Sequence, residues 1–97
     1  MSNPTYQLTL HKTYYDNGFF NLGVDVDRYV RTTSGPAKLQ LGKSKVTYPA
    51  TVNRKANLNG TPRIMGGPSV RDWLQRNFKE KDIVTVEIVA PDQFWLY

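Results

Sequence analysis

The chain consists of short segments in which apolar and polar residues alternate, and each segment ends at residues typical of turns. An alternation of period two indicates β-strands with one buried face. At Asp16-Asn17-Gly18 the sequence predicts a hairpin turn, because Asn and Gly tolerate positive φ. Pro49 is expected on an edge or at a bulge, since proline cannot donate to a ladder. The pattern predicts seven strands, over residues 6–15, 19–24, 37–42, 46–53, 61–65, 83–90 and 93–97.

Two short helices are predicted between these strands. Asp25 or Asp27 can cap the first, which contains Val26, Tyr29 and Val30. The second covers residues 70–78, begins at an N-cap Ser69, and buries a face made of Val70, Trp73, Leu74 and Phe78. With 97 residues, the chain is expected to form a single domain, residues 1–97. It should be mainly β, a barrel or twisted sheet whose open ends the helices plug.

Charge is distributed unevenly along the chain. The formal net charge is +5, from thirteen Lys and Arg against eight Asp and Glu. The stretch from Arg28 to Arg71 contains nine of the basic residues and no acidic one. A basic block of this kind is typical of a protein that binds a polyanion, and it favours a nucleic-acid partner.

Several classes are excluded by composition. The chain has no Cys and a single His, so disulfide frameworks, thiol nucleophiles and multi-His metal sites are ruled out. No apolar run approaches the roughly 20 residues needed to span a bilayer, and no signal peptide is visible. We therefore expect a soluble, cytoplasmic (intracellular) protein with no cofactor and no metal.

Catalytic motifs are weak. His11 lies in an alternating segment and is expected to be a surface residue, and Asp25 and Asp27 are expected to be helix caps. The Gly42-Lys43-Ser44 segment lacks the earlier glycine and the following helix of a phosphate loop. Pro91-Asp92 has no acid-x-Lys motif downstream. No catalytic residue is predicted.

Two predicted loops carry residues suited to DNA. Arg donates bidentately to guanine, Asn pairs with adenine and Asp accepts from cytosine, whereas Lys and Thr suit phosphates. The first loop is the predicted hairpin, with Lys12, Thr13, Tyr14, Tyr15, Asp16 and Asn17. The second follows the strand at 46–53 and presents Asn53, Arg54, Lys55, Asn57, Asn59, Thr61 and Arg63.

The order of elements resembles that of the DNA-binding pseudobarrel family. This B-three-like fold occurs in plant B-three transcription factors and in the recognition domains of bacterial type II restriction endonucleases. Residues 17–24 stand where the family has its second strand, 42–46 resemble its turn between strands three and four, and 73–86 resemble its closing helix, turn and next strand. Plant members usually carry Trp where Lys45-Val46 stands and Gly where Lys81 stands, so the bacterial members are the better comparison.

The resemblance implies a seven-stranded open pseudobarrel with two short helices capping its ends. It implies that two arms, residues 12–17 and 53–63, grip double-stranded DNA in the major groove, with Lys43 and Lys45 at phosphates. The expected function is sequence-specific DNA recognition in a restriction or anti-invader system (restriction-modification), with any cleavage by a separate nuclease domain or subunit.

Other functions remain open. Tyr14, Tyr15 and Tyr48 could serve as stacking surfaces in a small barrel that binds single-stranded DNA or RNA. A protein-interaction module, such as a phage-type inhibitor, is a third hypothesis, and a small hydrolase is a distant fourth. Binding that weakens as salt rises would favour nucleic acid over a protein partner.

Overall fold

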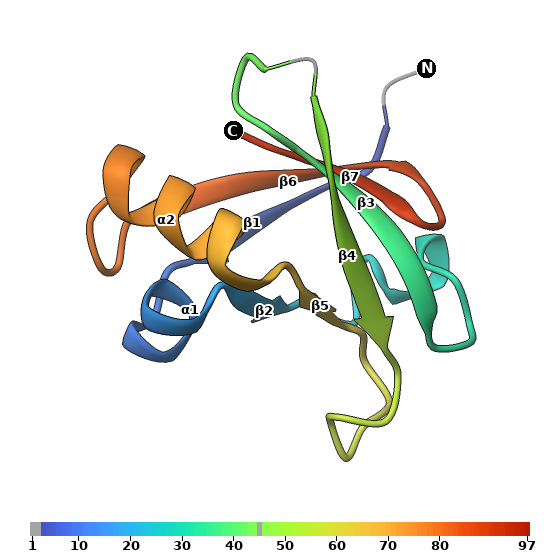
Figure 1. The fold of residues 1–97 in the computed structure, drawn as a ribbon. Helices are drawn as coiled ribbons and strands as arrows, with labels where there is room; N and C mark the ends of the chain where they lie inside the picture. The colour runs from blue at the N-terminus through green and yellow to red at the C-terminus, as the bar shows by residue number, and fades with distance from the viewer. Residues whose placement is uncertain (1–2, 45) are drawn as a thin grey trace.

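The alternating segments form seven strands of one curled sheet (Figure 1). The computed structural model describes residues 3–44 and 46–97. The strand order is β1-β6-β7-β3-β4-β5-β2, antiparallel except for the parallel pair β3–β7. The predicted class, a mainly β open pseudobarrel of seven strands with two α-helices, is confirmed. The strands are β1 (Thr5–Thr9), β2 (Phe19–Asn21), β3 (Gly35–Leu41), β4 (Thr47–Asn53), β5 (Arg63–Met65), β6 (Ile83–Ala90) and β7 (Gln93–Leu96).

The core lies on the inner side of the curl. Alternate side chains of each strand are buried there, for example Leu39 and Leu41 of β3 and Val52 of β4. Phe20 and Phe94 are completely buried and are the largest core side chains. Burial of each such side chain stabilises the fold by roughly 1.5–3 kcal/mol, so the alternation fixes which face of every strand is turned outward.

Three helical segments complete the structure. The helices α1 (Lys12–Asn17) and α2 (Gly67–Asn77) pack together at one end of the curl, and the 3-10 turn η1 (Asp27–Tyr29) lies at the other (Figure 1). Two predicted caps are wrong. The N-cap of α2 is Gly66 rather than Ser69, because Pro68 is accommodated in the first turn of the helix. The N-cap of η1 is Val26, without a side-chain hydrogen bond, rather than Asp25 or Asp27.

The hairpin predicted at Asp16-Asn17-Gly18 is also wrong. Residues 12–17 form α1 instead of extending the first strand, and Gly18, with φ of 73°, is the C-cap of that helix. Its amide donates to the Tyr14 carbonyl oxygen at 2.9 Å. β1 pairs with β6 and β2 pairs with β5, so the first two strands are not neighbours. A glycine with positive φ serves a helix end as readily as a hairpin.

For β4, the expected position of Val46 is wrong and that of Pro49 is confirmed. Val46 was expected to point inward, but it precedes the strand and is exposed. Pro49 does lie on an edge portion of β4, because β5 pairs only with residues 51–53 and leaves Pro49 with β3 as its neighbour. Across residues 3–44 and 46–97, no helix is long and apolar enough to cross a membrane.

Candidate nucleic-acid interface

The outward side chains of β2, β5 and β4 form a continuous surface, which we call the outer face. In one row across the three strands, Phe19, Met65 and Thr51 lie side by side. In the next outward row, Asn21 and Arg63 lie beside Asn53, while the intervening row is buried in the core. The outer face therefore consists of Phe19, Asn21, Thr51, Asn53, Arg63 and Met65.

Arg63 is held in place by its neighbours on the outer face. Its Nε donates to Oδ1 of Asn21 at 3.0 Å, and its Nη2 lies 3.5 Å from Oδ1 of Asn57. Its guanidinium carbon lies 4.6 Å from the centre of the Phe19 ring, a cation–π contact. Among the described residues, its Nη1 has no hydrogen-bond partner. Arg63 thus presents free donors in a fixed orientation, as bidentate recognition of guanine requires.

Arg54 lies at the start of the β4–β5 loop and does not present free donors. Its side chain is only 12% exposed and forms an ion pair with Asp27. Its Nη1 donates to the Gly60 carbonyl at 3.1 Å, its Nε to the Arg31 carbonyl at 2.7 Å, and its Nη2 to the carbonyls of Asp27 and Val30, both at 3.0 Å. All five N–H groups are occupied within the chain, so Arg54, which is predicted to contact DNA, holds the loop and has no free donor.

The amides of the β4–β5 loop are also turned inward. Nδ2 of Asn57 donates to Oδ1 of Asn21 and to the Thr61 carbonyl, each at 3.0 Å. Oδ1 of Asn59 accepts from the Thr61 hydroxyl at 2.7 Å and from its amide at 3.2 Å. Thr61 itself is buried. These three residues are predicted to contact DNA. In the structure the bonded atoms hold the loop in shape, and Nδ2 of the exposed Asn59 has no partner among the described residues.

The exposed residues of α1 form the second candidate contact region. Lys12 and Asp16, one helical turn apart, form an exposed ion pair of 2.7 Å. The hydrogen bond to Asp16 and its charge raise the pKa of Lys12, so this lysine stays charged throughout the neutral range. Thr13 and Asn17 are also exposed, and Nδ2 of Asn17 donates to the Thr13 carbonyl at 2.8 Å.

Tyr14 and Tyr15 are half-buried and pack against the core. The Tyr15 hydroxyl donates to the Phe78 carbonyl oxygen at 3.1 Å. The Tyr14 hydroxyl accepts from Nδ2 of Asn21 at 3.0 Å, and its ring meets Phe19 edge to face at 5.8 Å. Tyr14 therefore links α1 to the outer face.

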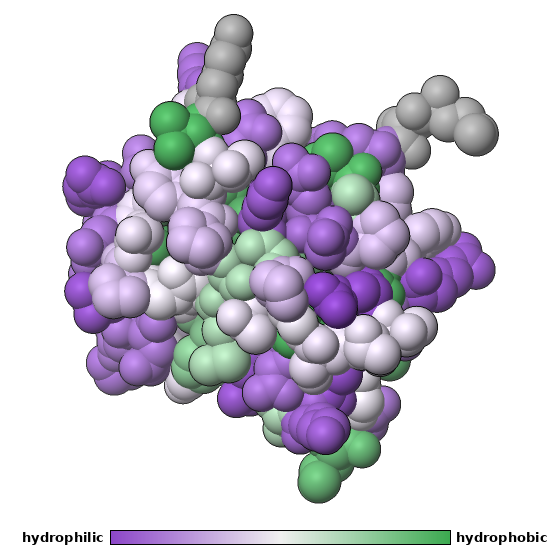
Figure 2. All heavy atoms as spheres, turned by 45° about the vertical axis from the view of Figure 1, so that its right-hand side comes forward, coloured by the Kyte–Doolittle hydropathy of each residue, from purple (hydrophilic) through white to green (hydrophobic). Residues whose placement is uncertain are grey.

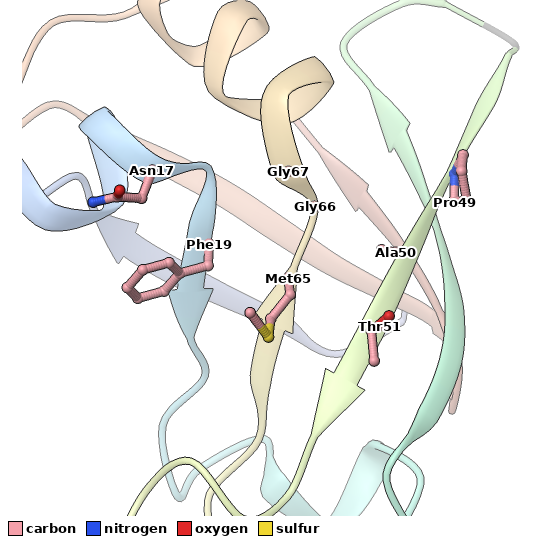
Figure 3. Close-up of a pocket in the computed structure, with 8 residues that line it drawn as sticks. All are labelled: Asn17, Phe19, Pro49, Ala50, Thr51, Met65, Gly66 and Gly67. Carbon is pink, nitrogen blue, oxygen red and sulfur yellow. The ribbon is translucent and has the colours of Figure 1, made fainter.

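A shallow hollow of about 320 Å³ lies on the outer face beside the end of α1. Figure 3 shows Phe19 and Met65 projecting from neighbouring strands, with Asn17 above them and Thr51 on β4. The remaining lining residues are Pro49, Ala50, Gly66 and Gly67. Because the side chains that project into the hollow include both apolar and polar groups, it suits the mixed edges of stacked bases.

The predicted lysines are distributed along β4. Lys55 is exposed at its C-terminal end, and Lys43 is exposed in the turn before its N-terminal end. The structure does not bring these two together, since a seven-residue strand separates them by roughly 20 Å. Lys45 lies outside the described residues.

The strands of the outer face carry no acidic side chain. β2, β3, β4 and β5 contain none, whereas β6 carries Glu87 on its outward side, bonded to Asn3 and Tyr97. That hydrogen bond to Glu87 raises the pKa of Tyr97. Within the described part of the chain, no three His, Cys, Asp or Glu side chains lie close enough together to hold a metal ion.

Five residues of the candidate interface were missed from the sequence, namely Phe19, Asn21, Thr51, Met65 and Leu58. Phe19 and Asn21 were expected only as part of a strand, although their spacing of two already places them on one face. Leu58, at the tip of the β4–β5 loop, is fully exposed, and its only signal is a lone apolar residue in a polar loop.

In comparisons with known proteins, no family model matches the chain and no curated protein matches its sequence. The resemblance to the B-three-like family therefore stays a prediction.

Proposed function

We propose that this protein binds double-stranded DNA with sequence specificity and places the outer face, α1 and the β4–β5 loop against the major groove. The observation that carries the proposal is Arg63. Two amides and an aromatic ring orient its guanidinium on a surface whose strands contain no carboxylate, and part of its donor set is free. An arginine prepared in this way suits O6 and N7 of guanine.

The lysines supply the second part of the proposal. Lys55 and Lys43, at opposite ends of β4, are spaced to contact different phosphates. Lys38 is exposed on the outward side of β3, beside Pro49, and adds a third cation. Phosphate contacts of this kind fix the position of the protein on the duplex without selecting a sequence.

On this proposal the protein is the recognition part of a restriction or anti-invader system and acts in the cytoplasm. It has no catalysis of its own, and a separate nuclease domain or subunit performs any cleavage. The support is the fold class together with the resemblance of residues 42–46 and 73–86 to the B-three-like family.

The test is a selection of bound duplexes from a randomised pool at moderate salt, using the full chain. We expect one sequence to be enriched, with a guanine at the position that Arg63 contacts. Arg63→Ala should weaken binding to that sequence by about 1–3 kcal/mol and relax the preference at one position. A pool with no enriched sequence would contradict the proposal.

A competition between duplex and single strand tests the main alternative. A single-strand binder needs exposed rings on which bases stack. Tyr14, Tyr15 and Tyr48 are instead half-buried and packed against the core. We therefore expect the duplex to compete better than either of its strands.

A further inference from the structure

Leu58 is unlike every other leucine of this protein. The chain has eight leucines, and seven of them are at most 3% exposed. Leu58 is fully exposed. It lies in the β4–β5 loop, which projects from the rest of the molecule (Figure 1), and Figure 2 shows hydrophobic atoms at the lowest point of the molecule, where this loop projects.

The position of Leu58 is fixed by a tight turn. The Gly60 amide donates to the Asn57 carbonyl at 3.0 Å, so Leu58 and Asn59 are the two central residues of a β-turn. Arg54 holds the Gly60 carbonyl from the other side at 3.1 Å. The leucine is therefore presented at a defined point rather than on a freely moving segment.

Most polar atoms next to Leu58 are bonded within the loop. Nδ2 of Asn57 donates to Asn21 and Thr61, and Oδ1 of Asn59 accepts from Thr61. The turn therefore exposes the isobutyl group of Leu58 beside Nδ2 of Asn59, with Lys55 nearby in sequence. A leucine side chain that is fully in water does not contribute the free energy that its burial would give. Contact with an apolar group of a partner would supply that free energy on binding.

The apolar feature of the DNA major groove is the C5-methyl group of thymine, and a methylated cytosine carries the same group. We propose that Leu58 contacts the C5-methyl group of a pyrimidine and thereby makes this arm selective for thymine or 5-methylcytosine. The inference rests on the proposed duplex binding. It adds an apolar contact from the residue that lies between Asn57 and Asn59.

The experiment begins with the best duplex from the selection described above. Each thymine is replaced in turn by deoxyuridine, and each cytosine by 5-methylcytosine, so that only a methyl group is removed or added. Affinities are measured for the wild type, for Leu58→Ser, and for Val89→Ser as a control. Val89 is an exposed apolar residue on β6, away from the proposed interface.

We expect the wild type to prefer the methylated pyrimidine by about fourfold to tenfold at one position. Leu58→Ser should lose that preference, whereas Val89→Ser should keep it. Thymine and 5-methylcytosine are distinguished by which replacement changes affinity at that position. Since Leu58 contacts no core residue, Leu58→Ser should unfold at the same urea concentration as the wild type.

Three results would overturn the inference. The wild type could be insensitive to every methyl group, or Leu58→Ser could retain the wild-type preference. Alternatively, Leu58→Ser could weaken binding to all duplexes equally, with the wild type bending the DNA. That result would indicate that the Leu58 side chain inserts between base pairs as a wedge. Failure of the proposed function can be told apart from failure of this inference, because it would appear already in the selection, where no duplex would be enriched.

Discussion

Arg54 and Arg63 lie at the two ends of the β4–β5 loop. Both are arginines, but their guanidinium groups bond to different partners. Arg54 has every N–H group bonded to a carbonyl or a carboxylate of its own chain. Arg63 has two amide partners and free donors. From the sequence the two are indistinguishable, because nothing local to either residue shows that Asp27 lies beside one of them. Only the packing of η1 against the loop makes that distinction.

The two arginines should therefore respond differently to replacement by lysine. Lysine keeps the charge but cannot reproduce the planar set of donors. We expect Arg54→Lys to lower the free energy of unfolding by about 3 kcal/mol, because buried carbonyls and Asp27 lose their partners. Arg63→Lys, the matched control, should cost about 1 kcal/mol. Urea denaturation measures both, and equal losses would contradict the structural assignment of Arg54.

Lys55 should behave as a phosphate contact. Its side chain is exposed and has no hydrogen-bond or ion-pair partner within the described residues. Lys55→Ala should weaken binding about equally for all duplexes and reduce the slope of log K against log salt by about one. Arg28→Ala, beside Val89 and Ala90 of β6, removes a charge away from the interface and should change neither quantity. A loss confined to one sequence would instead show that Lys55 contacts a base.

The helix α1 shows why one element could not be predicted. Its six residues are too few to be stable as an isolated helix. Two tyrosines and an Asp-Asn-Gly sequence, read locally, favour a strand and a hairpin. The helix forms because it packs on α2, with a close approach at Gly18. The residues of α2 that Gly18 approaches lie about 50 positions later in the sequence, roughly half the length of the chain, so no local pattern shows this contact.

Gly18 should therefore be more sensitive to substitution than its backbone angle alone implies. A Cβ at Gly18 would lie 2.3 Å from the Gly67 carbonyl oxygen and 2.8 Å from the Arg71 amide. At Gly60, with a similar φ of 77°, a Cβ would meet nothing within 4 Å.

We expect Gly60→Ala to cost about 1 kcal/mol, the strain of a left-handed residue. Gly18→Ala should cost about 3 kcal/mol, because backbone atoms of α2 must move as well. Urea denaturation of the two variants gives the difference. If the two losses are equal, the contact between α1 and α2 does not limit stability.

Four of the strands could be predicted well. β3, β4, β6 and β7 all lie where the alternation placed them, because a period of two over several residues with one buried face is a strong signal. The pairing of β1 with β6 and of β2 with β5 could not be predicted, because register between distant strands depends on contacts that no local pattern encodes. For the same reason the outer face could not be predicted as a surface, although two of its residues, Asn53 and Arg63, are among the predicted contacts.

Across the whole molecule, β2, β3, β4 and β5 carry Lys38 and Arg63 and no acidic side chain. Among the described residues, the cations left for a duplex on the proposed side are Lys38, Lys43, Lys55 and Arg63. Arg63 is assigned to a base, so contact of the three lysines with phosphates predicts a slope of log K against log salt of about −3. Measurement of the affinity between about 50 and 200 mM salt tests this value. A slope near zero would favour a protein partner, and a slope steeper than about −8 would mean that more of the surface takes part.

The placement of β7 has a consequence for how the chain reaches its structure. β7 lies between β6 and β3, and within residues 3–44 and 46–97 the pairings β6–β7 and β3–β7 are the only ladders that join the β1–β6 pair to the β3-β4-β5-β2 group. The residues at 93–96 leave the ribosome after those of every other strand. During synthesis, we therefore expect the two groups of strands to stay separate, with open hydrogen-bonding edges, until β7 is available to pair with both. Folding is expected to be all-or-none and comparatively slow, because the contacts that unite the sheet are distant in sequence.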